Sequence, residues 1–309
     1  MIEDHRQIEL AINPALKQKR WWGSILVLSG WAMILAGMGY ALMNVVGDLL
    51  PVVLGVAVAY IGVRLLNRGK RHFVPVGLAA LQKDPRPPVL YLRPFTEEGD
   101  IGQMSPNAIN RGFGEKGTWR ATALLVRFLD TYEQYIGFAF RKIGPLAAIG
   151  NPTDGLPHLG AYRIYVGLEG DWQKMVSTLA NQASYALLQI GSSDGLMWEV
   201  QYIVNHVQPE QLILCLPNEK IKISRLSGPQ KREERRQKIY QAFRTKTQEF
   251  FPKPLPADIG RAMFIYFDRD WNAQVSLFRS EPIFSRESIE IQLNDPKLVA
   301  LNWLNSVLY

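Results

Sequence analysis

The residues best suited to chemistry lie in one stretch, SSDGLMWEVQYI, at residues 192–203 of a 309-residue chain. The carboxylate of Glu199 can act as a nucleophile or a general base, or can hold a sugar hydroxyl. A simpler interpretation is an acidic residue in the first turn of a helix, where the helix dipole favours negative charge. Ser193, Asp194 and Trp198 crowd into the same stretch. We therefore expect a catalytic role for Glu199 and a substrate-binding role for these three neighbours.

Two further loops can complete a binding site. Arg93 opens the polar stretch RPFTEEGD directly after the apolar run VLYL, and its guanidinium can bind a phosphate or a carboxylate. Asn151 and Asp154 lie in NPTDGLPHLG, a loop rich in turn-forming residues. We add Arg93, Asn151 and Asp154 to the predicted substrate-binding residues. The first loop also carries acids that can bind ribose hydroxyls or a divalent cation, although such a run is more often a solvated loop: Glu97, Glu98 and Asp100.

One glycine-rich motif gives a weaker indication of ligand binding than these loops. GFGEKG, at residues 112–117, matches the pattern G-x-G-x-x-G. A dinucleotide fingerprint follows its strand directly, whereas a long polar stretch separates this motif from VLYL. It is not a Walker A loop either, because Lys116 precedes the last glycine. We interpret it as a flexible loop before a helix, with phosphate binding at the N-terminus of that helix as the alternative.

Metal and thiol chemistry find no support in the spacing of the residues. The 4 histidines are scattered, and none of them pairs at the spacing that metal ligands use, so we predict no metal site. The single cysteine, Cys215, lies inside the apolar run QLILCLP. We expect it to be a small buried hydrophobic residue and not a nucleophile.

Short apolar runs alternate with helix-like segments from residue 89 onward. Continuous apolar runs of this length are typical of parallel strands that are buried on both faces. We expect about four to six strands, drawn from residues 89–92, 145–150, 163–167, 185–191, 211–217 and 262–267. Apolar residues at the helical period predict helices at 118–141, 171–182, 195–207, 229–249 and 298–308.

These elements predict an open, mainly parallel, doubly wound α/β sheet. In sheets of this kind, ligands bind beyond the carboxyl ends of the strands. The loops RPFTEEGD, NPTDGLPHLG and GSSDGLMWE each follow an expected strand. We therefore expect Glu199 and the substrate-binding candidates to meet at one edge of the sheet.

The order of strand, polar loop, Gly, aromatic residue, Glu and apolar helix around Glu199 resembles the carboxylate region of nucleoside deoxyribosyltransferase-like folds. VLYLRPF, PLAAIG, NPTDGLPHLG and DWQKMVSTLANQASYALLQIG resemble successive segments of the superfamily that contains Toll/interleukin-1 receptor (TIR) domains. The resemblance covers roughly residues 88–218 and implies a flavodoxin-like or TIR-like sheet. It also implies that Glu199 cleaves the N-glycosidic bond of a nucleotide such as NAD, which would be the substrate or ligand, and that no further cofactor takes part.

The N-terminal part has a different composition. No charged residue occurs between Trp21 and Gly47, and after Asp48 the residues up to Val63 are again uncharged. Runs of this length can cross the hydrocarbon core of a bilayer as helices. We predict a transmembrane hairpin over residues 21–66, and the alternative is a buried hairpin in a soluble core.

Flanking charge predicts the orientation of this hairpin. Lys17, Lys19 and Arg20 precede the first span, and basic residues also follow the second span. Because positive residues stay on the cytoplasmic side, we expect an integral protein of the inner or plasma membrane with both termini in the cytoplasm. Small residues four apart can pack the two spans together or join protomers into a homo-oligomer: Ala32 and Ala36, Gly37 and Ala41, and Gly55 and Ala59.

The predicted organisation is a cytoplasmic segment at 1–20, the hairpin at 21–66, a linker at 67–88 and a cytosolic α/β domain at 89–309. The net charge is +7, and part of the excess lies in SRLSGPQKREERRQK, at residues 224–238. We interpret this stretch as a solvated helix face, with attraction to an anionic leaflet as the alternative. No recognisable nucleic-acid-binding module is present, so we expect the bilayer as a partner and no specific nucleic acid.

The sequence leaves three functions open. The first is a membrane-anchored nucleotide N-glycosidase that acts in signalling or bacterial defence. The second is a module whose crevice holds a nucleotide or a partner protein without chemistry. The third is a membrane protein whose cytosolic domain only assembles with itself.

Overall fold

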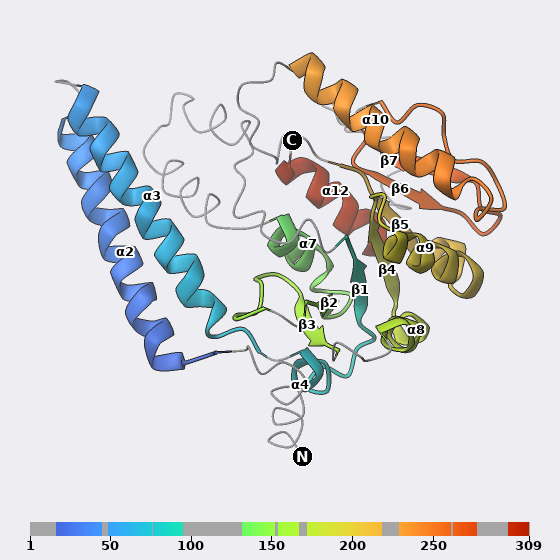
Figure 1. Cartoon of the computed structure of the whole chain (residues 1–309), viewed down its shortest axis with the longest axis horizontal. Helices are drawn as coiled ribbons and strands as arrows, with labels where there is room; N and C mark the ends of the chain where they lie inside the picture. The colour runs from blue at the N-terminus through green and yellow to red at the C-terminus, as the bar shows by residue number, and fades with distance from the viewer. Residues whose placement is uncertain are drawn as a thin grey trace.

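The computed structural model describes residues 17–44, 49–75, 77–94, 132–151, 154–166, 172–217, 229–260, 262–276 and 296–308. Two long antiparallel helices stand beside an α/β domain in which helices cover both faces of a sheet (Figure 1). The helices are α2 (Arg20–Met43), α3 (Leu49–Arg71), α4 (Gly77–Leu81), α7 (Tyr132–Phe140), α8 (Trp172–Gln182), α9 (Asp194–His206), α10 (Pro229–Thr247) and α12 (Pro296–Leu308). The strands are β1 (Val89–Leu92), β2 (Leu146–Gly150), β3 (Tyr162–Tyr165), β4 (Tyr185–Gln189), β5 (Leu212–Cys215), β6 (Phe264–Phe267) and β7 (Ala273–Ser276).

The sheet has seven strands in the order β3-β2-β1-β4-β5-β6-β7. The first five in this order are parallel, and β6 and β7 are antiparallel to their neighbours. The predicted mainly parallel α/β sheet is therefore confirmed. The flavodoxin-like topology is not confirmed, because a flavodoxin-like sheet has the strand order 2-1-3-4-5.

Alternating side chains of the strands divide the core into two layers. Leu90 and Leu92 of β1 pack on the side of α8, α9 and α10. Val89 and Tyr91 pack on the opposite side, against α7 and α12 (Figure 1). The central strand β1 is buried along its whole length, which explains its continuous apolar sequence. Cys215 is buried in the second layer, as expected, and burial raises the pKa of its thiol.

Several sequence predictions fall outside the described residues or miss an element. The loop GFGEKG, the acids of the first loop and the start of the predicted helix 118–141 lie outside them, and α7 occupies the end of that helix. The sequence did not indicate β7, a four-residue strand that pairs with β6. Helix α3 continues to Arg71 and α4 follows, so helices occupy part of the segment 67–88 that was predicted as a linker.

Glycines hold α2 and α3 together. They recur every seventh residue on both helices and face one another in three pairs: Gly37 with Gly55, Gly30 with Gly62, and Gly23 with Gly69. A Cβ atom added to Gly30 would lie 2.7 Å from the carbonyl oxygen of Gly62, so the two backbones touch. A seven-residue repeat keeps the glycines on one stripe of each helix. We call these three pairs the glycine seam.

The glycine seam explains only part of the small-residue pattern. The backbone of Ala41 lies 2.8 Å from a Cβ added to Gly55, and the amide nitrogen of Ala59 lies 2.6 Å from a Cβ added to Gly37. These small residues therefore close the hairpin on itself. Ala32 and Ala36 are instead exposed on the outer face of α2.

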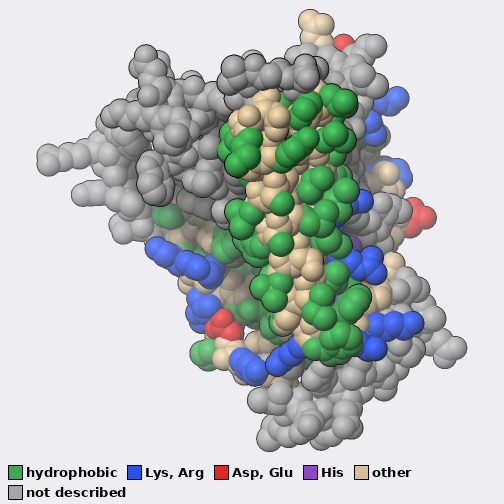
Figure 2. All heavy atoms as spheres, turned by 90° about the vertical axis from the view of Figure 1, so that its left-hand side faces the viewer, with side chains coloured by type: hydrophobic (Ala, Val, Ile, Leu, Met, Phe, Trp, Pro, Cys, Tyr) green, Lys and Arg blue, Asp and Glu red, His purple; other side chains and the backbone are tan. Residues whose placement is uncertain are grey.

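The outer surface of the hairpin is apolar. Arg20–Met43 and Leu50–Arg71 are both long and apolar enough to cross a membrane. Only 17% and 28% of their most apolar windows are buried, whereas the core helix of a soluble protein is mostly buried. Leu28 and Leu35 are 70% and 67% exposed. Hydrophobic side chains run along this face, and lysines and arginines gather toward its lower part (Figure 2).

The base of the hairpin is fastened to the loop that follows β2. The Arg71 guanidinium donates from Nε to the carbonyl oxygen of Pro157 at 2.8 Å, and it also donates to Leu156 O. The backbone N–H of Lys17 donates to Gly155 O at 2.9 Å. Gln18 bridges the end of α3 by donating from Nε2 to the carbonyl oxygens of Arg71 and Val74. The hairpin therefore meets the α/β domain near the carboxyl end of β2.

We predict that Gly30→Leu separates the two helices. The added side chain has no room beside Gly62 and Leu66, and overpacking of this kind costs about 1–3 kcal/mol. The matched control is Gly39→Leu in the same helix, because nothing lies within 4 Å of a Cβ at Gly39. Thermal unfolding in detergent, followed by tryptophan fluorescence, should show a lower midpoint for the first variant only. Equal midpoints would contradict the glycine seam.

Candidate functional site

The sheet has a switch point between β1 and β4. These strands pair in parallel, with β2 and β3 on one side of them and β5 on the other. In open α/β sheets, the crevice for ligands lies beyond the carboxyl ends of the strands at such a point. The loops that leave β1 and β4 adjoin there, since a Cβ added to Gly191 would lie 2.5 Å from Cγ of Pro94.

A buried ionic cluster lies next to this point, on the α7 side of the sheet. Glu133, at the start of α7, accepts a hydrogen bond from Arg163 of β3 at 2.6 Å and pairs with Arg93 at 3.3 Å. The other carboxylate oxygen of Glu133 accepts from the backbone N–H of Ala161 at 2.8 Å. The side chains of Arg93, Glu133 and Arg163 are 13%, 7% and 0% exposed.

Two polar residues extend the cluster toward β4. The Tyr91 hydroxyl donates to Oε1 of Gln189 at 2.5 Å. Burial raises the pKa of Tyr91 well above its usual value, so the phenol stays neutral and can donate. Tyr91 also lies close enough to both arginines and to the glutamate to feel their charges. We call the five residues the arginine cluster: Tyr91, Arg93, Glu133, Arg163 and Gln189.

Among the described residues, the arginine cluster holds more positive than negative charge. Two guanidinium groups share one carboxylate; Glu133 and Arg163 are buried and Arg93 is mostly buried. Nε and Nη1 of Arg163 have no hydrogen-bond partner among the described residues. A buried charged donor without a partner is costly, so the site is suited to an anion such as a phosphate or a carboxylate.

Glu199 lies on the other face of the sheet. Helix α9 begins at Asp194, so Glu199 is in the second turn and not in the first turn as the simpler interpretation expected. It shares the buried stripe of α9 with Leu196, Val200 and Ile203 and is 6% exposed. No hydrogen bond or ion pair joins it to another described residue, and burial raises its pKa to about 8. At neutral pH the carboxyl group is therefore mostly protonated.

Three predicted substrate-binding residues have local structural roles. The Ser193 hydroxyl caps α9 by accepting from the Leu196 N–H at 3.4 Å, and Asp194 is the acidic residue of the first turn. The Trp198 ring meets Trp172 of α8 at a centroid distance of 5.0 Å and stacks on Tyr202 at 5.3 Å. The contact between Trp172 and Trp198 joins α8 to α9.

The loop after β2 turns toward the hairpin. Asp154 lies 3.6 Å from Nε2 of His158, and its charge acts on Arg71 at the end of α3. The Asp154 N–H donates to the carbonyl oxygen of Asn151 at 3.0 Å. Asp154 therefore supports the junction between the hairpin and the α/β domain.

The structure thus brings together only part of the predicted site. Arg93 is joined to Glu133 and, through it, to Arg163, neither of which was predicted from the sequence, whereas Glu199 lies on the other face of the sheet. One signal was available, because Arg163 is a charged residue within an otherwise apolar strand. The side chains of Glu133 and Arg93 could not be paired without the fold, since the two residues lie 40 positions apart in the sequence.

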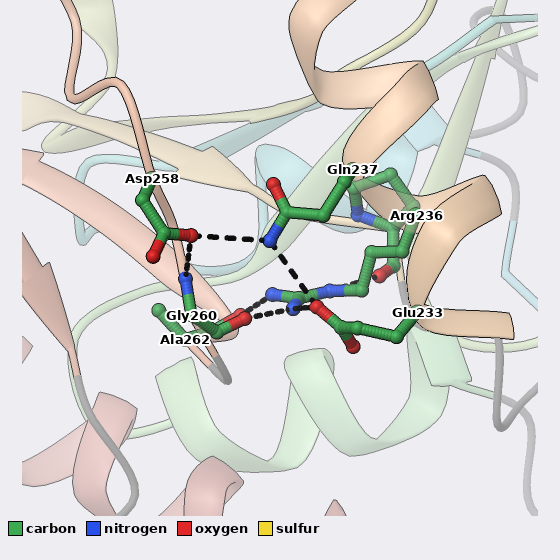
Figure 3. Close-up of polar contacts among 7 residues, drawn as sticks. Glu233, Arg236, Gln237, Asp258, Gly260 and Ala262 are labelled. Atoms are coloured by element: carbon green, nitrogen blue, oxygen red, sulfur yellow. Dashed lines mark hydrogen bonds and ion pairs between the residues drawn. The ribbon is translucent and has the colours of Figure 1, made fainter. Parts of the chain in front are cut away.

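Part of the basic stretch at 224–238 is structural. Arg236 of α10 is 4% exposed and donates to backbone carbonyl oxygens at Pro217 (3.0 Å), Gly260 (2.5 Å) and Ala262. Figure 3 shows Glu233 and Gln237 completing the network around it. Asp258 accepts from both Gln237 and the Gly260 N–H. Arg236 therefore fastens α10 to the segment before β6, and it is neither solvated nor available to a membrane.

We predict that Glu199 makes folding stability dependent on pH. The carboxyl group loses its proton near pH 4.5 in the unfolded chain and near pH 8 in the folded chain. The contribution of Glu199 to the free energy of unfolding is therefore fully present below pH 4.5. It is lost as the pH rises to 8, by a total on the order of 4 kcal/mol. Glu199→Gln, which mimics the protonated acid, should remove this slope.

The measurement is urea-induced unfolding between pH 5 and pH 8. The two proteins should be similar at the acidic end, and the variant should be the more stable one at the alkaline end. Glu234→Gln is the matched control, because Glu234 is exposed on α10 and its loss should leave the pH dependence unchanged. Parallel curves for Glu199→Gln and the unaltered protein would show that Glu199 is ionised in the folded state.

Comparison with known proteins assigns no family to this arrangement. No protein-family model, no curated protein and no solved structure matches the chain. The resemblance to TIR domains and to deoxyribosyltransferase-like folds therefore remains a prediction from the residues between 88 and 218. The geometry of the arginine cluster and of Glu199 is what bears on function.

Proposed function

We propose that this protein is a membrane-anchored α/β module that binds a phosphate-bearing ligand, such as NAD or another nucleotide, at the switch point between β1 and β4. One observation carries the proposal. The Arg163 guanidinium is fully buried, has two nitrogens without a partner among the described residues, and shares its only described carboxylate with Arg93. A bound phosphate would supply the missing acceptors and the missing negative charge.

The position of the cluster also supports a nucleotide. The strand order β3-β2-β1-β4-β5 is the order that dinucleotide-binding sheets use, with the ligand at the switch point. The shared strand order is an argument by analogy, because one fold serves many functions. The chemistry of the site adds to it, since arginines bind phosphate and the Tyr91–Gln189 pair offers polar contacts for a sugar or a base.

The hairpin would hold this module at the inner or plasma membrane. Its two ends lie together, and Lys17, Lys19, Arg68 and Lys70 gather there. The excess of basic residues at this end supports a cytoplasmic location for both termini and for the α/β domain. The exposed pair Ala32 and Ala36 offers a small-residue face through which two hairpins could form a homo-oligomer.

We predict that Arg163→Met weakens ligand binding without unfolding the protein. Removing Arg163 takes away a buried cation, two nitrogens of which have no hydrogen-bond partner among the described residues, and leaves the Glu133 carboxylate paired with Arg93, so we expect the fold to be kept. Affinity for the ligand should fall by roughly 10- to 100-fold, because charge-assisted hydrogen bonds are lost. Binding should therefore weaken while the unliganded protein still unfolds cooperatively near its usual midpoint, which a general folding defect would not produce.

The measurement is the thermal shift of the full chain in detergent with NAD, ATP, ADP and inorganic phosphate. Arg269→Met is the matched control, because Arg269 is 89% exposed and, among the described residues, forms a surface pair with Glu210 alone. It should keep the ligand-induced shift of the unaltered protein. The proposal fails if no nucleotide or phosphate shifts the midpoint, or if Arg163→Met responds like the control.

A second candidate function is N-glycosidic cleavage of NAD by Glu199, and the isolation of this carboxyl group favours it. Groups whose pKa burial has moved toward neutrality are enriched at catalytic sites. A carboxylate that attacks or stabilises the ribosyl group must be ionised. Because the pKa of Glu199 is about 8, most of the protein holds the protonated, inactive form at neutral pH.

We predict for this function that kcat/KM rises about tenfold per pH unit and levels off above pH 8. Release of nicotinamide from NAD, measured with the protein reconstituted in vesicles, tests it. Glu199→Gln should remove the turnover and Glu234→Gln should retain it. Absence of turnover, together with a nucleotide-induced thermal shift, would leave the binding function and exclude the glycosidase.

A further inference from the structure

A second cationic site lies at the base of the hairpin, away from the switch point. It is a pocket of about 720 Å³ between the segment before α2, the last turns of α3 and the loop after β2. None of the described residues that line it is acidic. Its basic lining residues are Lys17, Lys19, Arg64, Arg68, Arg71 and His72. We call this cavity the basal pocket.

One face of α3 forms the wall of the basal pocket. Arg64, Asn67, Arg68 and Arg71 recur at helical spacing and therefore lie on the same stripe. Arg71 is held by the carbonyl oxygens of the loop after β2, so it fixes the shape of the wall. The Lys19 N–H donates to Nδ1 of His72 at 3.1 Å and closes the pocket at the start of α2.

Asn67 shows that the basal pocket lacks a polar occupant. The residue is 8% exposed and lines the pocket. Its Oδ1 and Nδ2 atoms have no hydrogen-bond partner among the described residues. Buried amide groups are normally paired, because an unpaired one loses its contact with water without compensation. A ligand in the pocket that both accepts and donates hydrogen bonds would satisfy Asn67.

The charge of the basal pocket selects an anion. His72 is buried, and its pKa lies below the usual value because of burial and of the positive charges of Arg68 and Arg71. The Arg64 guanidinium lies 5.8 Å from the ring centre of Tyr60. Arg64 therefore places a cation one helical turn before Arg68, farther from the α/β domain. The cations are therefore arranged along the helix from the apolar surface to the α/β domain.

The position of the basal pocket indicates that the anion is part of a lipid headgroup. Exposed apolar side chains of α2 and α3 begin directly beside it, and Trp22 both lines the pocket and is 44% exposed. Tryptophan is enriched at the level of lipid headgroups, and basic pockets at the cytoplasmic ends of membrane helices bind phosphate-bearing headgroups. A hairpin that spans a bilayer would place this pocket at the headgroup layer.

We propose that the basal pocket binds the phosphate of an anionic lipid headgroup, with Lys19 and Arg68 supplying charge and Asn67 a hydrogen bond. The acyl chains would lie along the apolar surface of α2 and α3. This inference rests on the proposed membrane placement of the hairpin, and it does not depend on ligand binding at the arginine cluster. Free phosphate shares the headgroup chemistry, and the experiment distinguishes the two.

The test titrates the full chain in detergent with dihexanoyl phosphatidylglycerol, and in parallel with the zwitterionic phosphatidylcholine of the same chain length. Native mass spectrometry reports the number of bound lipids and their affinity. One phosphatidylglycerol should bind with clear preference. The double variant Lys19→Gln and Arg68→Gln should lose roughly 30-fold in affinity, because each basic residue contributes a similar share. The matched control, Lys238→Gln with Arg269→Gln, removes the same charge from exposed sites of the α/β domain.

Three results would overturn the inference. Equal affinity for the two lipids would remove the headgroup preference, and equal affinity of both double variants would place the lipid elsewhere. Inorganic phosphate that binds as tightly as phosphatidylglycerol and displaces it would identify free phosphate as the occupant. Flotation of the protein with phosphatidylcholine vesicles tests membrane placement separately, so loss of the headgroup preference with intact flotation contradicts the inference alone.

Discussion

The parallel pairing of β1 with β4 is the constraint on which the α/β domain depends. Both strands lie in the middle of the sheet, where neither face of β1 reaches water. Their pairing sends the loops after Leu92 and Gln189 to the same edge and separates α7 from α9 on opposite faces. The arginine cluster and Glu199 therefore occupy two layers of one edge, each with its own electrostatic environment.

The elements of the fold were readable from the sequence, but the partners of the functional side chains were not. Uninterrupted apolar runs such as VLYL and LILC mark strands because both faces are buried. Strand β7, AQVS, lacks that signal because it is a polar edge strand. Small residues four apart pointed to close helix packing, but the pairing of Gly30 with Gly62 depends on where the hairpin turns, which composition does not state.

In the candidate site, too, single residues could be identified from the sequence, whereas their partners and their environment could not. Glu199 was identifiable because it follows a strand and a glycine-containing loop, but its neutral state results from burial by residues distant in sequence. Arg93 was identifiable by its place after β1, whereas its partners Glu133 and Arg163 are brought to it by α7 and β3. The net charge of +7 divides into roles that composition cannot separate: Arg236 fastens a helix, Arg163 has two nitrogens without an acceptor among the described residues, and Arg68 lines a pocket.

The hydrogen bonds of Arg71 join the end of α3 directly to the loop after β2, so a displacement of the helix is passed to the loop. A flexible tether would not pass it on. Arg71 is the last residue of α3, and it holds the backbone of the loop at 156–157 that leaves β2. A helix in a bilayer changes its tilt with the thickness of the hydrocarbon layer. Because the bond runs from a helix end to a loop backbone, a change of tilt displaces that loop at the carboxyl edge of the sheet. In the membrane placement proposed for the hairpin, the thickness of the bilayer would thus become a mechanical variable of the α/β domain.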